Sequence, residues 1–596
     1  MISSFRLEYI FRCNIAFHSS TLRLPATSSN RRASARATRH MTMSYDVEDA
    51  LGLDAVRASS SSGPALPRSS EAANVDDATA RLGLLAPRLD APRSDATGAN
   101  DGDCEELIST PTFRVDEALD AIGFGKFQLG VLAFTGFAWV SDAMEMMLLS
   151  FIGPAMRCEF HVSARAEGAL TSAVFAGMML GAPGWGALSD SRGRRAALLF
   201  ATTTTIIGGL GSALAPSFSA VLAFRCVVGV GLGGVPVAFG LFTEFLPSSS
   251  RGVNLTLINL FWTLGSALES ALAWIVLPRY SWRVLLLVST LPLFVLIACL
   301  LIVPESPLYS MAANRDDEAM ATLSRVAATN RKLLPRGRLV PTVTTSREEL
   351  EFETRIPYGE RTFGQKYIPK GLRALLGAKH RKTSLLVWFI FFGVAFLYYG
   401  VVLLNTQLRV FDGEDVNGDI ACLPHGAPYL SNSEYLEIFI DSLAEVPGVV
   451  LAAIFIDSLG RKRTMSYTLL ITGVMLIPLA FGSMRGFVRN FLLFFTRSSA
   501  FAGFTAVYVF SAEIYPTHMR SSGIGVANGW ARIGGMVCPF FSVAFVENGN
   551  LALAIAVFVS VALLSAWCAT SLDVETAGRK LDAEEPGIEL APVPIS

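Results

Sequence analysis

Two acidic residues interrupt an otherwise apolar stretch near residue 140. Asp142 and Glu145 lie in the run 127–153, three positions apart, so on a helix they share one face. An ionisable side chain inside a membrane span costs roughly 2.5–3.5 kcal/mol on insertion scales, so it needs a partner or a water-filled path. Two carboxylates at this spacing can exchange protons or hold a cation. The alternative is that Asp142 pairs with an internal arginine such as Arg225 and only stabilises the bundle.

Further charged side chains fall within apolar stretches of the same kind. Because both acidic and basic residues occur, several different ion pairs among them are possible. An arginine that faces a cavity can instead bind the carboxylate of a substrate through two hydrogen bonds. The candidates for contact with a solute or a proton are Asp142, Glu145, Arg225, Glu269, Glu445 and Arg532, with Asp441 and Arg497 as additional buried charges. The sequence does not say which of them face inward.

A short charged motif occurs twice in the chain. Asp190-Ser-Arg-Gly-Arg-Arg195 follows the second apolar stretch and returns as Asp457-Ser-Leu-Gly-Arg-Lys-Arg463 after the eighth. Residues around the two copies also match at a nearly constant offset, which chance does not easily arrange: Arg225 with Arg497, Glu244 with Glu513, Pro247 with Pro516, and Arg251 with Arg520. The chain therefore contains two related halves.

The two copies of the motif are spaced to act as latches. In each, an aspartate can pair with an arginine across helix ends and accept the positive end of a neighbouring helix dipole. Glu244 with Arg251, and Glu513 with Arg520, can form further pairs on the same face. The alternative is that the basic residues only set the topology. The predicted latch residues are Gly186, Asp190, Gly193, Arg194, Arg195, Glu244, Arg251, Asp457, Gly460, Arg461, Arg497, Glu513 and Arg520.

Long apolar helices must position these groups. Of the 596 residues, 52% are hydrophobic and 17% charged, which is too apolar for a soluble domain. A spanning helix needs roughly 20 mostly apolar residues. The stretches that meet this description are 127–153, 168–188, 197–215, 219–245, 254–277, 284–303, 385–404, 435–456, 465–483, 489–511, 523–546 and 551–570. We expect an all-α polytopic membrane protein with twelve transmembrane helices in two pseudo-symmetric six-helix halves.

The loops and tails suggest an orientation. Lys and Arg gather after the second and eighth spans and in the central loop, which places these segments in the cytoplasm, together with both termini. The expected parts are a disordered tail at 1–110, a helical half at 115–303, a loop at 304–384, a second half at 385–572 and a tail at 573–596. Residues 1–42 have the composition of an organellar targeting segment; the alternative is a natural start at Met41 or Met43.

Several classes of function are disfavoured. The net charge of −1, with no basic stripe, argues against a nucleic-acid partner. Neither a Walker loop nor a Ser/His/Asp or Cys/His set occurs within the spans, so we expect no enzyme and no cofactor. The cysteines form no zinc pattern, and no metal is expected. Cys158 and Cys422 fall in loops on the non-cytoplasmic side, where a disulfide could form. Single loop cysteines are more often unpaired, so free thiols are the favoured alternative.

Two short patterns match motifs of other functions, a glycine-rich nucleotide-binding turn and a glycosylation sequon. Gly229-Val-Gly-Leu-Gly-Gly234 fits a dinucleotide-binding turn, but it lies inside an apolar span, where small residues favour close helix packing. Asn254-Leu-Thr256 is a formal glycosylation sequon at the expected cytoplasmic start of a span, so we expect it to be unused.

The first copy of the motif resembles the signature of a known family. Gly186-Ala-Leu-Ser-Asp-Ser-Arg-Gly-Arg-Arg195 is similar to the loop Gly-x-Leu-x-Asp-x-x-Gly-Arg-Arg of the major facilitator superfamily and lies where that loop belongs. Pro304-Glu-Ser-Pro307 resembles the sugar and organic-ion branch, although Leu308-Tyr309 replaces the usual Arg-Trp. The resemblance covers roughly residues 115–572 and implies a solute site near mid-membrane between the halves.

Other segments are similar to a particular branch of that superfamily. Ser141–Met147, Thr243–Pro247 and Ala512–Pro516 most resemble synaptic-vesicle-2-related proteins, plant organic cation/carnitine transporters and bacterial nicotinate transporters. The end of the seventh span resembles a substrate-gating helix of the superfamily, which adds Tyr398, Tyr399 and Asn405, with Gln407, to the candidates.

This resemblance implies a secondary transporter that works by alternating access. The expected partners are a small organic ion, protons and the lipid bilayer; a sugar is the next alternative as substrate. A membrane receptor or vesicle protein that kept the fold without transporting is the rival class. The plasma membrane is the expected location, with vesicular, vacuolar and plastid membranes as alternatives. The sequence is silent on the oligomeric state.

Overall fold

The computed structural model describes residues 111–248, 251–340, 370–377, 379–412, 421–424, 426–481, 486–515, 517–547 and 549–577. The expected amino-terminal tail, 1–110, lies outside the described residues, as does most of the expected tail 573–596. Residues Asp103–Ser596 form one compact unit, to which everything below refers.

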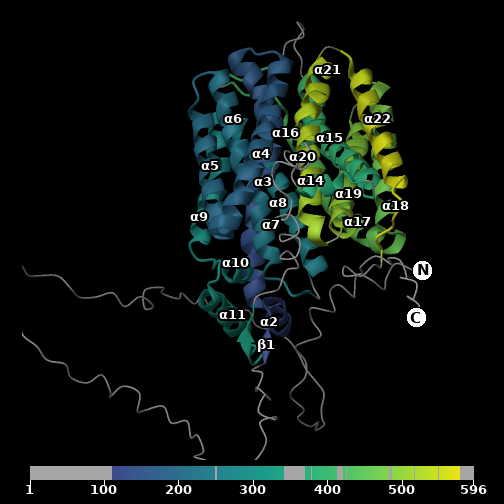
Figure 1. The fold of residues 1–596 in the computed structure, drawn as a ribbon. Coiled ribbons are helices and arrows are strands. Elements are labelled where there is room, and N and C mark those ends of the chain that lie inside the picture. The colour runs from purple at the N-terminus through teal and green to yellow at the C-terminus, as the bar shows by residue number, and fades with distance from the viewer. Residues whose placement is uncertain are drawn as a thin grey trace, which may run out of the picture. The chain divides into compact units, whose positions relative to one another are not determined.

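Six helical segments form the amino-terminal half, in which the fourth is broken into two helices. They are α3 (Lys126–Phe160), α4 (Ala164–Arg192), α5 (Arg194–Leu214), α6 (Phe218–Leu232) with α7 (Val235–Thr243), α8 (Arg251–Val276) and α9 (Trp282–Leu300). Figure 1 shows them side by side as one bundle, coloured from purple-blue to teal.

Six further segments form the carboxy-terminal half. They are α15 (Arg381–Asp412), α16 (Asn432–Leu443) with α17 (Glu445–Leu459), α18 (Arg461–Leu476) with η3 (Ile477–Phe481), α19 (Phe487–Ile514), α20 (Thr517–Pro539) with η4 (Phe540–Ala544) and α21 (Phe545–Glu547), and α22 (Leu551–Thr570). The predicted spans coincide with these segments, although most helices extend beyond the predicted ends.

Nine segments within the described residues are both long and apolar enough to cross a membrane. α4, α8 and α20 have the length but are less apolar. The reason is their position, because α4 packs against α20 and α8 against α16, where the two halves meet. Side chains on the outer helices, such as Ile207 and Trp567, are largely exposed, as lipid-facing residues must be. The chain is an all-α polytopic membrane protein.

The glycine-rich segment packs helices closely, as the sequence predicts. A Cβ atom at Gly229 would overlap the backbone of Val174 in α4, and one at Gly231 would overlap Thr205 in α5. The chain then turns between α6 and α7 at Gly233 and Gly234. Small residues here let three helices approach through their backbones, so a nucleotide-binding interpretation has no place at this site.

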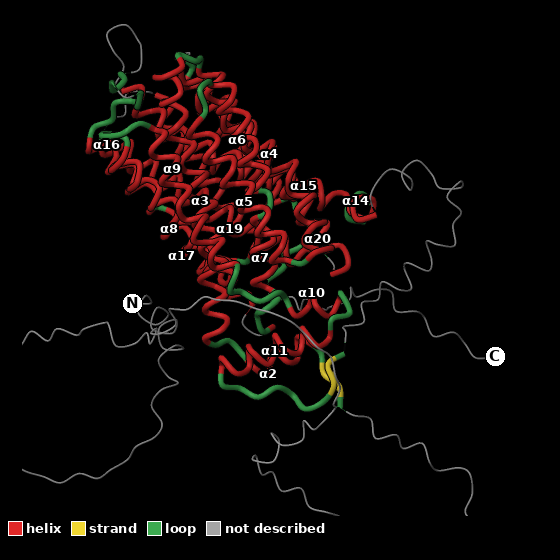
Figure 2. The backbone as a smooth tube through the Cα atoms, turned by 90° about the vertical axis from the view of Figure 1, so that its left-hand side faces the viewer, coloured by secondary structure: helices red, strands yellow, loops and turns green. Residues whose placement is uncertain are grey.

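A small appendage lies beyond the end of the amino-terminal half. It contains β1 (Thr112–Phe113), α2 (Val115–Ile122), α10 (Pro307–Ala312), α11 (Asp316–Asn330) and β2 (Arg338–Leu339). The strands pair in parallel, and Figure 2 shows α2, α10 and α11 at the opposite end of the molecule from α16. The stretch predicted as a loop at 304–384 therefore contains ordered helices, among them α14 (Lys370–Leu375).

The structure joins Cys158 and Cys422 in a disulfide, so the favoured alternative of free thiols is wrong and the other one holds. Cys158 lies at the end of α3 and Cys422 in the connection between α15 and α16, so the bond links the two halves. Sequence separation hid this contact, since the two cysteines are 264 positions apart in the sequence. We call this membrane side the disulfide face, and the side that carries 190–195 and 457–463 the signature-loop face.

Candidate functional site

Glu145 and Arg225 form a buried ion pair in the amino-terminal half. Arg225 Nη1 lies 2.9 Å from Glu145 Oε2, and neither side chain is more than 2% exposed. Arg225 Nε also donates to Ser212 Oγ of α5 at 2.9 Å. Within the described part of the chain, Glu145 Oε1 and Arg225 Nη2 have no hydrogen-bond partner. It is Glu145, rather than Asp142, that takes Arg225, and the pair retains unused hydrogen-bonding capacity.

Glu269 of α8 belongs to the same buried cluster. Both of its carboxylate oxygens accept from Ser289 Oγ of α9 at 2.9 Å, and the side chain is fully buried. The charges of Glu145 and Arg225 act on it electrostatically. Two acids therefore share one arginine in this half, an arrangement that is balanced when one acid carries a proton.

Glu445 and Arg497 form the corresponding pair in the carboxy-terminal half. Arg497 Nη2 lies 2.7 Å and Nε 3.1 Å from Glu445 Oε1, and both residues are buried. Tyr398 Oη of α15 donates to the same carboxylate oxygen at 2.7 Å. The sequence places Arg497 among the latch residues. It is instead buried within the helix bundle, because it pairs with Glu445, just as its repeat partner Arg225 is buried against Glu145.

A chain of contacts continues from this pair into the other half. Trp262 Nε1 of α8 donates to Tyr398 Oη at 2.7 Å. Arg497 also approaches the sulfur of Met147 in α3, with its Nη2 atom at 3.8 Å. Glu445 is therefore connected to α8 through two hydrogen bonds, and its arginine contacts α3. In the sequence, Trp262 is one of several aromatic residues of the spans and Met147 ends the run Ser141–Met147, but neither pattern predicts these contacts.

Asp142 is buried, and one of its carboxylate oxygens has no hydrogen-bond partner among the residues that the structure describes. Its side chain is 4% exposed, and the oxygen in question is Oδ1. The charge of Arg532 in α20 acts on it across the interface, and both groups act on Tyr399 and Tyr508. Asp142 and Glu145 share a helix, but of the two only Glu145 has an arginine partner among the described residues.

A small cavity adjoins Asp142 inside the amino-terminal half. It measures about 20 Å³, and Ser141, Thr202 and Thr205 are among its lining residues. About 10–15 Å³ suffices for one water molecule when polar partners are near. The hydroxyl groups of the lining can supply them, so the cavity is suited to a single water beside the acid.

Asn405 and Gln407, at the end of α15, have other partners than Tyr398 and Tyr399, with which the sequence analysis groups them. Asn405 accepts a hydrogen bond from Arg409, which also donates to Asp441 at 2.9 Å. Gln407 donates to Glu167 of α4. These contacts lie toward the disulfide face, where the second one joins the halves. The arrangement suits them to closing that face.

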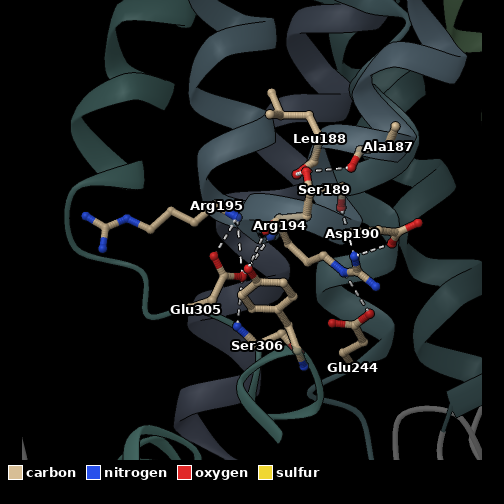
Figure 3. Close-up of polar contacts among 11 residues, drawn as sticks. Ala187, Leu188, Ser189, Asp190, Arg194, Arg195, Glu244, Glu305 and Ser306 are labelled. Carbon is tan, nitrogen blue, oxygen red and sulfur yellow. Dashed lines mark hydrogen bonds and ion pairs between the residues drawn. The ribbon is translucent and has the colours of Figure 1, made fainter. Parts of the chain in front are cut away.

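The first latch motif makes the contact that its spacing predicts. Arg194 Nη1 lies 2.7 Å from Asp190 Oδ1, and Nε lies 3.1 Å from Glu244 Oε1 (Figure 3). Arg195 instead donates to backbone carbonyls at the end of α9, with Nε 2.7 Å from that of Leu300. The expected pair of Glu244 with Arg251 involves a side chain outside those described. Gly186 has open space around its α-carbon.

The second latch repeats this geometry more loosely. Arg461 Nε lies 3.0 Å from Glu513 Oε2, but Nη1 lies 3.5 Å from Asp457 Oδ1. Glu513 thus takes Arg461 rather than Arg520, the partner that the sequence suggests, and Arg520 Nε is buried without a partner in the described region. The reason is that the arginine at the start of α18 is the one directed at the end of α19.

Two glutamates that the sequence analysis missed cap the helices after each motif. Glu305 Oε1 accepts from the backbone N–H of Arg194 at 2.9 Å, as Figure 3 shows, and Glu575 Oε1 accepts from that of Arg461 at 2.9 Å. The positive end of the helix dipole is therefore met by these glutamates and not by the motif aspartates. Their near-equal offset in the sequence, Glu305-Ser against Glu575-Thr, is the signal that was available.

Glycine precedes each capped helix for a conformational reason. Gly193 has φ = 99° and Gly460 has φ = 89°, values that other residues rarely adopt. A Cβ atom at either position would also meet the capping carboxylate of Glu305 or Glu575. The motif thus requires glycine twice, for the backbone and for the approach of the cap.

Comparison with known proteins identifies the family of the chain. A family model described as "Sugar (and other) transporter" matches residues 131–406, and one described as "Major Facilitator Superfamily" matches residues 438–595. Organic cation/carnitine transporter 7 of Arabidopsis thaliana is 40% identical over 489 residues, which are 79% of this chain and 96% of that protein. The synaptic vesicle 2-related protein of Rattus norvegicus is 37% identical over 84% of this chain and 87% of its own.

Solved structures share the fold. The xylose transporter XylE of E. coli, in a partially occluded inward open conformation, superimposes with a TM-score of 0.57 at 16% identity, covering 76% of this chain and 99% of XylE. A D-xylose–proton symporter gives a TM-score of 0.56 over the same shares, also at 16% identity. At this identity the likeness concerns the arrangement of the helices alone.

Proposed function

The chain belongs to the major facilitator superfamily, together with organic cation/carnitine transporter 7 and the synaptic vesicle 2-related proteins, and from this premise we propose that it carries a small organic ion by proton-coupled alternating access. In this mechanism two rigid halves rock about a central site, so that the site opens to one membrane side at a time.

The observation that carries the proton-coupled part is the Glu145–Arg225 pair. It is buried inside a membrane helix bundle, it is incompletely hydrogen-bonded, and Glu269 adds a second acid beside it. Proton uptake by one acid leaves the arginine with a single charged partner; proton release restores repulsion between two carboxylates. Such a cluster can therefore change its net charge between the two states of a transport cycle.

The contacts between the halves support alternating access. Between the described residues, the cross-half hydrogen bonds run from mid-depth, at Trp262–Tyr398, to the disulfide face, at Trp274–Asn432. The latch contacts of the signature-loop face each remain within one half. This is the pattern of a molecule closed at the disulfide face, and the latches are free to rearrange when the opposite face closes.

The proposal also includes an orientation. The signature-loop face is cytoplasmic, because it carries Arg192, Arg195, Lys462 and the central loop, and basic loops remain on the cytoplasmic side. Both termini then lie in the cytoplasm, and the disulfide lies on the oxidising side of a plasma membrane, or in a vesicle lumen.

Uptake by the purified protein in proteoliposomes tests the proposal. Labelled nicotinate, carnitine and hexose are offered with and without a pH gradient, with empty liposomes as the control. We expect uptake of an organic ion that rises with the gradient. Uptake of hexose alone contradicts the organic-ion part and favours a sugar transporter. If folded protein takes up none of them, the non-transporting membrane protein is favoured.

A further inference from the structure

A run of basic residues comes directly before the first span of the carboxy-terminal half. Residues 370–382 contain five Lys or Arg and no acidic residue, and the sequence from 361 to 411 has neither Asp nor Glu. α14 ends at Leu375 and α15 begins at Arg381, so the run joins a short helix to a membrane span. We call residues 370–382 the basic segment.

The exposed apolar surface of α15 begins where the basic segment ends. Arg381 and Lys382 are exposed, and Leu385, one turn further on the same face of the helix, is 49% exposed. An exposed leucine on a membrane span faces the lipid tails, whereas an exposed basic side chain at the end of a span reaches the polar side of the boundary. These basic groups therefore lie at the depth of the lipid headgroups.

A neighbouring span shows the same boundary. Lys382 Nζ lies 2.6 Å from Asp573 Oδ1, which places the start of α15 beside the segment that follows α22. Trp567, in the last turn of α22, is 63% exposed, and indole rings favour the level of the headgroups. Lys462 of α18 donates to the backbone carbonyl of Leu572. Basic side chains of α15 and α18 thus gather at the end of a span that carries an interfacial tryptophan.

Apolar side chains hold the basic segment against the bundle. Leu375 of α14 is fully buried, and Leu372 is partly buried against the same core. Leu376, the next residue after the helix, is 37% exposed. α14 also packs against α20. The charges of the segment therefore stay close to the membrane boundary.

We propose that the basic segment, together with Lys462, binds the headgroup of an anionic phospholipid on the signature-loop side of the membrane. The lipid phosphate takes the ammonium and guanidinium groups, and the acyl chains lie along the exposed apolar face of α15 that begins at Leu385. Clusters of four to eight Lys or Arg directly before a span attract acidic lipids, which are concentrated in the cytoplasmic leaflet. That leaflet is the one that the proposed orientation gives to this face.

A membrane lipid fits this surface better than a soluble anion does. The basic groups adjoin an apolar face that only acyl chains can cover, and a soluble phosphate leaves that face unused. The alternative is that the basic residues set the topology of the chain and bind nothing. In that case the folded protein has no preference between lipids of different charge.

Native mass spectrometry of the purified full chain in detergent counts the bound lipids. Phosphatidylserine and phosphatidylcholine with identical acyl chains are titrated separately, and glycerophosphoserine serves as the soluble headgroup. Each Lys or Arg near the lipid surface contributes about fivefold to affinity. We expect phosphatidylserine to bind at least about tenfold more tightly than phosphatidylcholine, and glycerophosphoserine to bind far more weakly than the intact lipid.

Substitutions in the basic segment remove the preference. Lys379→Gln, Arg381→Gln and Lys382→Gln together remove three exposed positive charges and should weaken phosphatidylserine binding at least about tenfold, with phosphatidylcholine binding unchanged. Lys379→Arg with Lys382→Arg keeps the charge and should bind as the wild type does. Elution profile and thermal unfolding report whether each variant is folded.

The matched control removes the same number of charges from the appendage, away from the spans. Its substitutions are Arg325→Gln, Lys332→Gln and Arg336→Gln, all at exposed residues. This variant should keep the preference for phosphatidylserine. An equal loss in the control would show that net charge alone attracts the lipid, and would overturn the assignment to the basic segment.

Two further results overturn the proposal. Equal affinity of the folded wild-type protein for the two lipids leaves the basic residues with the topological role alone. Glycerophosphoserine that binds as tightly as phosphatidylserine indicates a site for a soluble anion. Neither result bears on the proposed transport, which solute uptake tests separately.

Discussion

The buried arginines of the two halves occupy equivalent helices but have different partners. Arg225 pairs with Glu145 of α3, the first span, whereas Arg497 pairs with Glu445 of α17, in the second span of its half. The first pair is surrounded by its own half; the second is tied to the opposite half through Tyr398 and Trp262. Both halves therefore have an arginine at the equivalent position, but its surroundings differ. The Glu145–Arg225 pair is suited to proton exchange, and the Glu445–Arg497 pair is suited to contact between the halves.

The largest effect expected from this comparison concerns stability. Arg225→Gln leaves Glu145 buried without a partner, and breaking a buried pair in this way costs about 3–5 kcal/mol. Arg497→Gln should cost less, because Glu445 keeps its hydrogen bond from Tyr398. Thermal unfolding of both variants in detergent measures the difference. A greater loss for Arg497→Gln would contradict the comparison.

Tyr398→Phe tests the contact between the halves. It removes the donor to Glu445 and the acceptor for Trp262, and a hydrogen bond to a charged group is worth about 1.5–3 kcal/mol. The matched change in the other half, Ser212→Ala, removes one hydrogen bond to Arg225 and should leave the approach of the halves unaltered. Spin-label distances across the signature-loop face should shift in the first variant alone; equal shifts would show that the tyrosine has no particular role.

The two acids should differ in coupling. A one-unit pH gradient drives about tenfold accumulation when one proton moves with each solute. Glu145→Gln should abolish this accumulation but keep exchange of solute for solute, whereas Glu445→Gln should keep both the gradient response and the exchange, at a reduced rate. Both responses are measured by uptake into proteoliposomes whose external buffer is more acidic than their interior. Full accumulation by Glu145→Gln places the proton site elsewhere.

The smallest difference is expected between the latches. Asp190→Asn breaks a contact of 2.7 Å and Asp457→Asn one of 3.5 Å, and both aspartates are more than three-quarters exposed. Exposed pairs contribute about 0–1 kcal/mol, so neither variant should unfold. We expect Asp190→Asn to slow initial uptake more than Asp457→Asn does. Unchanged uptake by Asp190→Asn at equal surface expression removes the latch role from the motif.

The sequence alone predicted the helices, the two halves and the first latch contact, because each depends on local information. A long apolar stretch predicts a helix that is buried or faces lipid. Asp190 and Arg194 are four residues apart, about one helical turn, so their contact follows from helix geometry. Contacts between distant segments could not be derived in this way. Asp142 and Glu145 share one face of α3, so spacing could not decide which of them takes Arg225.

Only the tertiary structure decided how the charges are distributed. Glu305 and Glu575 become caps because the ends of α9 and α22 approach the starts of α5 and α18. Cys158 meets Cys422, and Trp262 donates to Tyr398, because the halves are packed together. The amino-acid sequence determined that charges enter the apolar spans and that one motif recurs. The packing of two bundles determined which charges are paired, since electrostatic energy depends on distance in space.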